Sequence, residues 1–246
     1  MSTLAGTAIK LTFVDKPPND FAPLFYPHGG SAPAMASVNA GNSAQLYVGG
    51  GGTNSGFARA LSKLKIDAYA ARHQALLAKA RGGGPDIETY ADTDPMAFSL
   101  VYPTALPSKK GSDEDGVCFV DVFAPEHCPN GVSDNAAMLY VAPPNGPNYA
   151  DKATFLAAIR QTASNVATTM GRYNKIAGSH GVPAIPALRL CLFSSGIYNS
   201  FSISSNRIAE QICAGLGDVL AKDDCGLTKV QLPVADPLFY IIQDQV

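Results

Sequence analysis

The sequence is poor in charge and has no long apolar run. Charged residues make up 15% of its 246 residues, and the net charge is −2. This balance offers no basic surface to duplex nucleic acid or to an anionic membrane. No stretch approaches the roughly 20 apolar residues of a membrane span, and Lys10 and Asp15 interrupt the segment where a signal peptide needs an apolar core. We therefore expect no duplex nucleic acid partner, no membrane contact and an intracellular, cytoplasmic location.

Paired cysteines are also lacking. The five cysteines are widely spaced and never form a C-x-x-C pair, which is typical of a reducing compartment rather than of a disulfide framework. His127 and Cys128, together with Cys118, are the only residues that suggest a metal cluster. Because no second paired ligand accompanies them, we expect no metal site and no cofactor.

Apolar residues make up 46% of the chain, enough for a large core, and segments of strand and helix periodicity alternate along it. Strands and helices intermix without a linker, so we expect a single α/β domain over residues 1–246, with helices on both faces of a sheet. Residues 86–116 are polar and contain prolines, so we expect a long connection there, with one strand near 98–102. The predicted strands are 9–13, 33–38, 117–123, 138–142, 188–193 and 238–243, and the predicted helices are 57–64, 69–80, 155–170 with Asp151 as N-cap, and 208–219.

Glycine is in excess, and its densest run is residues 49–52, which precede the helix predicted from Phe57. Successive glycines let the backbone approach a ligand, and a helix N-terminus presents unpaired N–H groups, so this segment predicts an anion site. The alternative is a flexible surface loop. Known phosphate motifs do not fit, because Phe57 stands where a Walker loop needs lysine and Asn54 or Ser55 stands where a dinucleotide fingerprint needs its third glycine.

A second loop has the same character. It follows the strand predicted at 188–193 and contains Ser194, Ser195 and Gly196. Small residues at the carboxyl end of a strand expose backbone donors, and open α/β sheets bind ligands at this end. Two such loops suit a diphosphate.

Three segments resemble the signatures of macrodomains, in the same order along the chain. Asn39-Ala40-Gly41-Asn42 is similar to V-N-A-A-N, residues 49–52 to G-G-G, and Ser194-Ser195-Gly196-Ile197-Tyr198 to S-[TS]-G-I-[YF]. The resemblance implies a three-layer α/β/α sandwich with a central mixed sheet that binds ADP-ribose in a cleft at the strand ends. Residues 68–135 match nothing in this family and would be an insertion.

The resemblance also implies a role for each site residue. Asn42 would bind the distal ribose, with Asn39 supporting its loop, and Tyr198 would cover that ribose. Asp15 would read the adenine amino group, with Asp20 as the second candidate. From the residues alone, Asp15 can equally be a turn residue, and Tyr198 can be a packing residue. The diphosphate would be held by the backbone of Gly50, Gly51, Gly52, Thr53, Asn54, Ser194, Ser195, Gly196 and Ile197.

Many macrodomains remove ADP-ribose, and one active branch has an aspartate where this chain has Asn54. An amide cannot act as a carboxylate base. Other active members lack this aspartate and use a water activated by the substrate phosphate, with the residue matching Asn42 orienting the ribose. We therefore expect binding of ADP-ribose or ADP-ribosylated protein, and we slightly favour hydrolysis of an ADP-ribosyl bond, with water attacking C1″, over a non-enzymatic reader. Another nucleotide-binding α/β enzyme is the third alternative.

Overall fold

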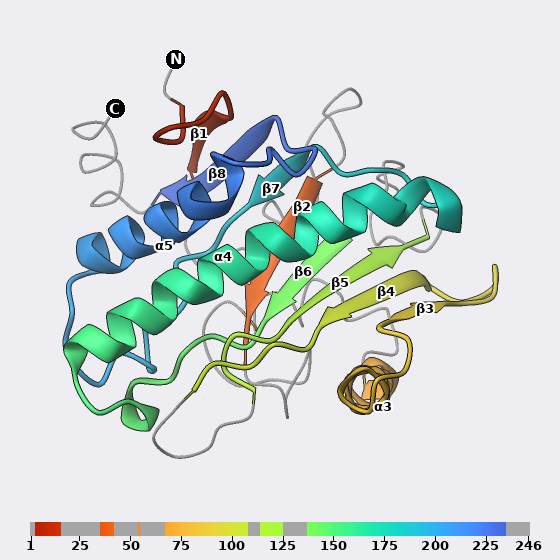
Figure 1. The fold of residues 1–246 in the computed structure, drawn as a ribbon, viewed down its shortest axis with the longest axis horizontal. Coiled ribbons are helices and arrows are strands. Elements are labelled where there is room, and N and C mark those ends of the chain that lie inside the picture. The colour runs from red at the N-terminus through yellow and green to blue at the C-terminus, as the bar shows by residue number, and fades with distance from the viewer. Residues whose placement is uncertain are drawn as a thin grey trace.

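The computed structural model describes residues 3–15, 35–41, 54, 67–107, 114–124 and 137–234. Its centre is an eight-stranded mixed sheet in the order β1-β8-β7-β2-β6-β5-β4-β3 (Figure 1). The first five strands in this order are parallel, and β5, β4 and β3 follow as antiparallel neighbours. The strands are β1 Lys10–Asp15, β2 Met35–Ala40, β3 Ile87–Thr89, β4 Met96–Tyr102, β5 Cys118–Phe123, β6 Ala137–Val141, β7 Ala187–Arg189 and β8 Lys229–Val234.

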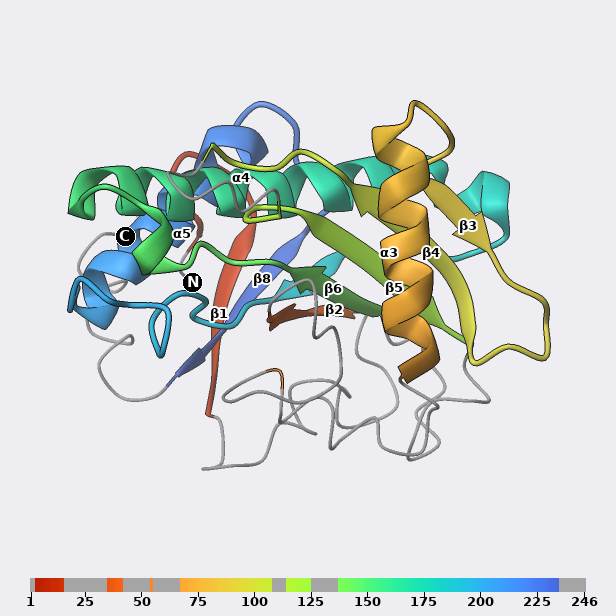
Figure 2. The same cartoon turned by 90° about the horizontal axis from the view of Figure 1, so that it is seen from below.

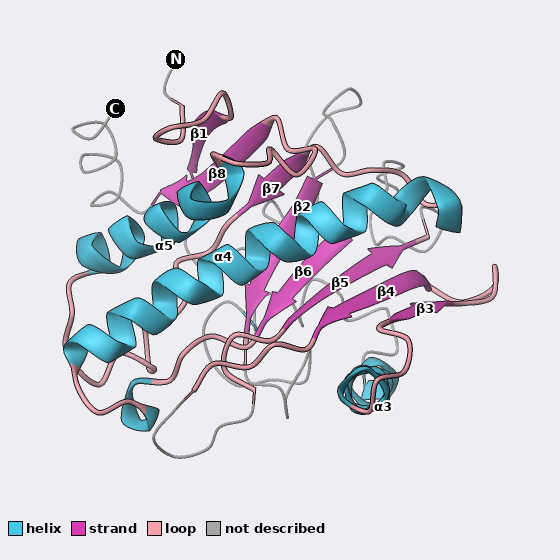
Figure 3. Cartoon of the chain, in the orientation of Figure 1, coloured by secondary structure: helices cyan, strands magenta, loops and turns pink. Residues whose placement is uncertain are grey.

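Helices cover both faces of the sheet, which confirms the three-layer α/β/α architecture. Figure 2 shows α4 and α5 along one side of the sheet and α3 beside β4 and β5, and Figure 3 separates the helices from the strands by colour. On β5, Val120 and Val122 belong to the core cluster shared with α4, whereas the alternate residues Phe119 and Asp121 contact His73 of α3. The helices are α3 Asp67–Arg81, α4 Lys152–Ile176 and α5 Ser205–Leu220, with the short 3₁₀ helices η3 Gly146–Asn148 and η4 Ala177–His180.

The periodicity located most of the described elements and misjudged some strands. The strand expected at 188–193 ends at Arg189, so β7 is shorter than predicted. The strand β8 was not predicted, and β3 lies in the stretch interpreted as a connection. The strand predicted at 238–243 and the helix predicted at 57–64 lie outside the described residues. None of the helices in the described ranges is long and apolar enough to cross a membrane.

The parallel arrangement determines where a site can form. The carboxyl ends of β1, β8, β7, β2 and β6 lie at the same edge of the sheet. The chain therefore leaves the sheet at this edge after β2, toward residues 49–52, and after β7, toward residues 194–198. Some 150 residues separate the two strands in the sequence. We call this edge of the sheet the carboxyl edge.

The longest of the described helices, α4, begins at the N-cap predicted from the sequence. The Asp151 carboxylate accepts a hydrogen bond from the Thr154 backbone N–H at 2.8 Å, and the Thr154 hydroxyl completes a capping box. These hydrogen bonds lower the pKa of Asp151. A lowered folded-state pKa contributes stability above the ordinary aspartate pKa, and this contribution is lost as the pH falls through the lowered value.

We therefore expect Asp151→Asn, which keeps the cap but not the titration, to flatten the loss of Tm below about pH 4. The effect is small because the group is exposed. Thermal unfolding between pH 6 and pH 2 measures it. Asp92→Asn, at an exposed turn residue, is the matched control, and an equal change in both variants would contradict the assignment to the cap.

Candidate binding site around Tyr140

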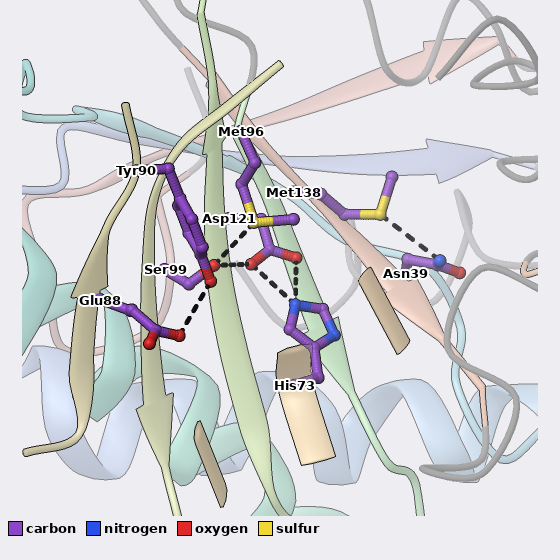
Figure 4. A network of polar contacts seen from close by, with 8 residues as sticks. All are labelled: Asn39, His73, Glu88, Tyr90, Met96, Ser99, Asp121 and Met138. Atoms are coloured by element: carbon purple, nitrogen blue, oxygen red, sulfur yellow. Dashed lines mark hydrogen bonds and ion pairs between the residues drawn. The ribbon is translucent and has the colours of Figure 1, made fainter. Parts of the chain in front are cut away.

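Two residues of the macrodomain-like signatures meet at the carboxyl edge. Asn39, near the end of β2, is fully buried, and its side-chain amide donates to Oδ1 of Asn54 at 3.0 Å. The same amide lies 3.4 Å from the Met138 sulfur (Figure 4). Oδ1 of Asn39 is buried and has no hydrogen-bond partner in the part of the chain that the structure describes. Asn39 thus ties Asn54 to β2 and leaves one buried acceptor at the site.

Tyr140 of β6 stands at the centre of this arrangement. A Cβ on Gly41 would collide with the Tyr140 hydroxyl and would lie 3.0 Å from Cγ of Asn54, so the three residues are in close contact. Burial raises the pKa of the Tyr140 phenol well above its usual value, and the neighbouring ionisable groups of Tyr198 and Glu114 raise it further. Tyr140 therefore stays protonated at neutral pH.

The loop of residues 194–198 is held on the loop that follows β6. Ser194 has a left-handed backbone, with φ of 62°, and its hydroxyl donates to the Pro144 carbonyl at 2.8 Å. The Gly146 N–H donates to the Tyr198 carbonyl at 2.8 Å. A Cβ on Gly146 would lie 2.7 Å from that carbonyl, so only glycine allows this approach. Both ends of the loop are therefore tied to the segment after β6.

Between these ties the loop presents backbone donors. The N–H groups of residues 194–197 have no hydrogen-bond acceptor among the described residues. The loop is open to solvent at its tip, where Ile197 is 84% exposed. Successive backbone N–H groups in a turn that includes a left-handed residue form an anion-binding concavity. The geometry thus fits an anion bound by backbone donors.

The remaining site predictions fall on parts that the structure does not describe. Asp15 ends β1, but its side chain is outside the described part, so its adenine contact stays a prediction. His127 and Cys128, which the sequence analysis did not favour as metal ligands, also lie outside the described residues. Among the described residues, no group of three or more His, Cys, Asp or Glu side chains is placed to hold a metal ion. The other predicted residues outside the described ranges are Asp20, Asn42, Gly50, Gly51, Gly52 and Thr53.

A row of polar side chains crosses the sheet on the face that α3 covers. His73 of α3 contacts the Asp121 carboxylate at 2.8 to 2.9 Å, and the Ser99 hydroxyl donates to the same carboxylate at 2.6 Å (Figure 4). His73 and Asp121 are fully buried, and the His73 ring stacks on Phe119 with 4.5 Å between ring centroids. These contacts fix α3 on the sheet beside Tyr140. In register order the polar residues are Thr12, Gln231, Arg189, Ser37, Asp121, Ser99 and Glu88, with the apolar Met138 between Ser37 and Asp121.

More than half of the chain matches a known protein family. Residues 90–215, just over half of the chain, match the family described as the Mitochondrial association factor 1 C-terminal domain. The chain belongs to this family. The match includes Tyr140 and residues 194–198, and it leaves out β2 and Asn54. The family match therefore includes β6 and β7, the two strands that flank β2 in the sheet, but not β2 itself.

The chain is also similar in sequence to a curated protein and in fold to several solved structures. The chain is 32% identical over 197 residues to the DNA/RNA-binding protein ALBA4 of Plasmodium falciparum (isolate 3D7), which covers 74% of this chain and 52% of that protein. The chain thus spans about half the length of this relative. The Trypanosoma brucei macrodomain has a TM-score of 0.54 at 12% identity, over 96% of this chain and 66% of that one. Its complex with ADP-ribose has a TM-score of 0.51 at 12% identity, over 97% and 70%. These structural similarities show that this chain has a macrodomain-like fold.

Sequence reasoning missed Tyr140, because it appeared only as one apolar position in a predicted strand. The signal that could have found it is the alternation along β6, since Leu139 belongs to the core cluster under α4 and its neighbour must face the other side. Its proximity to Gly41 could not be read from the sequence, since it depends on the parallel pairing of β2 with β6.

Proposed function

We propose that this chain binds ADP-ribose, or proteins that carry ADP-ribose, at the carboxyl edge. The observation that carries the proposal is the run of backbone N–H groups at residues 194–197, which have no acceptor among the described residues and lie at the solvent-exposed loop. A diphosphate is an anion of the right kind for such donors, because it accepts several hydrogen bonds and needs no lysine or arginine.

The neighbouring residues support a ribose on the same ligand. Asn39 keeps a buried acceptor oxygen at the end of β2, and Tyr198 lies in the loop that the Gly146 N–H ties to the segment after β6. Hydroxyl groups of a ribose supply the donors that such an acceptor needs. Structural neighbours of the same fold include a macrodomain solved in complex with ADP-ribose. In the proposed complex, Asn42 and residues 50–53 complete the site, and Asp15 contacts the adenine.

Binding without hydrolysis is the form of the proposal that the described residues support. Asn54 is an amide, and its oxygen already accepts the hydrogen bond from Asn39. It therefore supplies no carboxylate base for an attacking water. Hydrolysis of an ADP-ribosyl bond through a water activated by the substrate phosphate, with Asn42 orienting the ribose, is the enzymatic alternative.

Calorimetric titration with ADP-ribose, AMP, ATP and NAD tests the proposal. We expect ADP-ribose to bind at least about tenfold more tightly than AMP, because AMP has no second phosphate or distal ribose for the 194–198 loop. Absence of both heat and a Tm shift at millimolar ADP-ribose would contradict it.

A second assay separates the functional classes. Incubation with an ADP-ribosylated protein should leave the modification in place if the chain is a reader. Release of ADP-ribose, lost in Asn42→Ala, would instead establish the hydrolase. Because one relative is named a DNA/RNA-binding protein, single-stranded RNA is titrated in parallel. Binding of RNA without binding of ADP-ribose would replace the proposed ligand.

A further inference from the structure

A buried carboxylate outside all the sequence motifs holds the segment on which the 194–198 loop rests. Asp115, in the turn before β5, is 5% exposed. One of its oxygens accepts from the Tyr149 hydroxyl at 3.0 Å, the Asn145 backbone N–H at 3.3 Å and the Asn148 side-chain amide at 3.5 Å. Burial raises the pKa of the Tyr149 phenol, and the Asp115 carboxylate raises it further, so this phenol remains a donor.

The residues held by Asp115 are those that carry the loop. Asn145 immediately precedes Gly146, whose N–H donates to the Tyr198 carbonyl, and follows Pro144, whose carbonyl accepts from Ser194. A chain of short contacts therefore runs from Asp115 through residues 144–149 to both ends of the 194–198 loop. The turn that carries Asp115 is itself fixed, since the Gly116 N–H donates to the Ala142 carbonyl and the Asp115 carbonyl accepts from Leu106.

We propose that Asp115 is a positioning residue of the ligand site, which holds residues 144–149 and through them orders the 194–198 loop for the diphosphate and distal ribose. It does not touch the ligand. This inference rests on the proposed function for its ligand, although the contacts themselves do not depend on it. It also gives a function to one residue of the stretch 68–135, which matched no macrodomain signature, because Asp115 lies in this stretch.

The test compares two ligands that differ at the end covered by the loop. We expect Asp115→Ala to weaken ADP-ribose about tenfold, because the loop must then be ordered on binding. AMP, which lacks the distal phosphate and ribose, should bind as it does to the unchanged protein. A general loss of structure would weaken both ligands equally, so the ratio of the two Kd values separates positioning from unfolding.

Conservative and control variants narrow the interpretation. Asp115→Asn keeps an acceptor oxygen and should restore most of the affinity for ADP-ribose. Tyr149→Phe removes the shortest of the three hydrogen bonds and should reduce the affinity for ADP-ribose less than Asp115→Ala does. The double variant should bind ADP-ribose no more weakly than Asp115→Ala alone, because that hydrogen bond is already absent. Asp86→Ala removes a carboxylate that pairs with Arg172 on α4, and it should leave both affinities unchanged. An unchanged ADP-ribose affinity in Asp115→Ala would overturn the proposal.

Hydrogen exchange in the ligand-free protein gives a second measurement that needs no ligand. The amides of residues 144–149 and 194–200 should exchange faster in Asp115→Ala than in the unchanged protein and in Asp86→Ala. If the unchanged protein fails to bind ADP-ribose, the proposed function fails, and exchange still decides the positioning role. If it binds ADP-ribose but exchange in Asp115→Ala is unaltered, the positioning role alone fails.

Discussion

Replacing Asp121 by alanine is expected to lower the free energy of unfolding by about 3–5 kcal/mol. The carboxylate is fully buried and binds both His73 of α3 and the Ser99 hydroxyl of β4. Alanine would leave these two groups buried without that acceptor and would open a cavity between α3 and the sheet. Urea unfolding followed by circular dichroism measures the change.

The matched control is an ion pair on the surface. Asp218 binds Arg160 through two hydrogen bonds of 2.7 Å between α5 and α4, but both side chains are largely exposed. Asp218→Ala should therefore change stability little. If Asp121→Ala gives too little folded protein, Asp121→Asn, which keeps one acceptor, is measured instead and should still lose more stability than Asp218→Ala. Equal losses at the two positions would show that burial of the Asp121 network does not stabilise α3 on the sheet.

Gly41→Ala is expected to reduce the affinity for ADP-ribose by about tenfold or more, which corresponds to the 1–3 kcal/mol typical of overpacking. The new methyl group would collide with the Tyr140 hydroxyl and crowd the Asn54 side chain. Either residue must then move, and both lie at the proposed site. Calorimetric titration of the variant measures the loss.

A second substitution tests the cause. Tyr140→Phe removes the oxygen that the methyl group meets, so Gly41→Ala combined with Tyr140→Phe should bind ADP-ribose more tightly than Gly41→Ala alone, with Tyr140→Phe as the baseline. Gly178→Ala is the control glycine, because an added Cβ there meets nothing within 4 Å. Failure of Tyr140→Phe to recover affinity would show that the contact with Tyr140 is not the reason for the loss.

Sequence reasoning pointed to residues of the candidate site only where a short motif defines its own local backbone geometry. The 194–198 loop was found because small residues after a strand expose backbone donors whatever surrounds them. Asn39 and Asn54 were found through their place in signatures, but their hydrogen bond to each other was not, because 15 positions separate them. Asp115 was overlooked for a different reason. It follows acidic residues in a polar stretch, where a solvated loop is the usual outcome, and only the fold places Tyr149 and Asn145 around it.

An element of the fold was predictable where its own residues carry a clear apolar pattern or a capping signal. The stripe of α4 and the capping box at Asp151 are local, so its helix was located well. The strands β3 and β8 were not, since β3 has three residues and β8 contains a proline, and their pairing partners stabilise them.

The sequence by itself determined the α/β class and the main helices, because these follow from periodicity and capping over a few residues. From backbone freedom it also predicted two loops suited to an anion. Only the tertiary structure placed Tyr140 against Gly41 and Asn54, Asp115 against Asn145 and Tyr149, and Asp121 in a buried network with His73. The strand order and register bring these distant residues together, and whether a polar side chain is solvated or buried depends on what the rest of the chain packs against it.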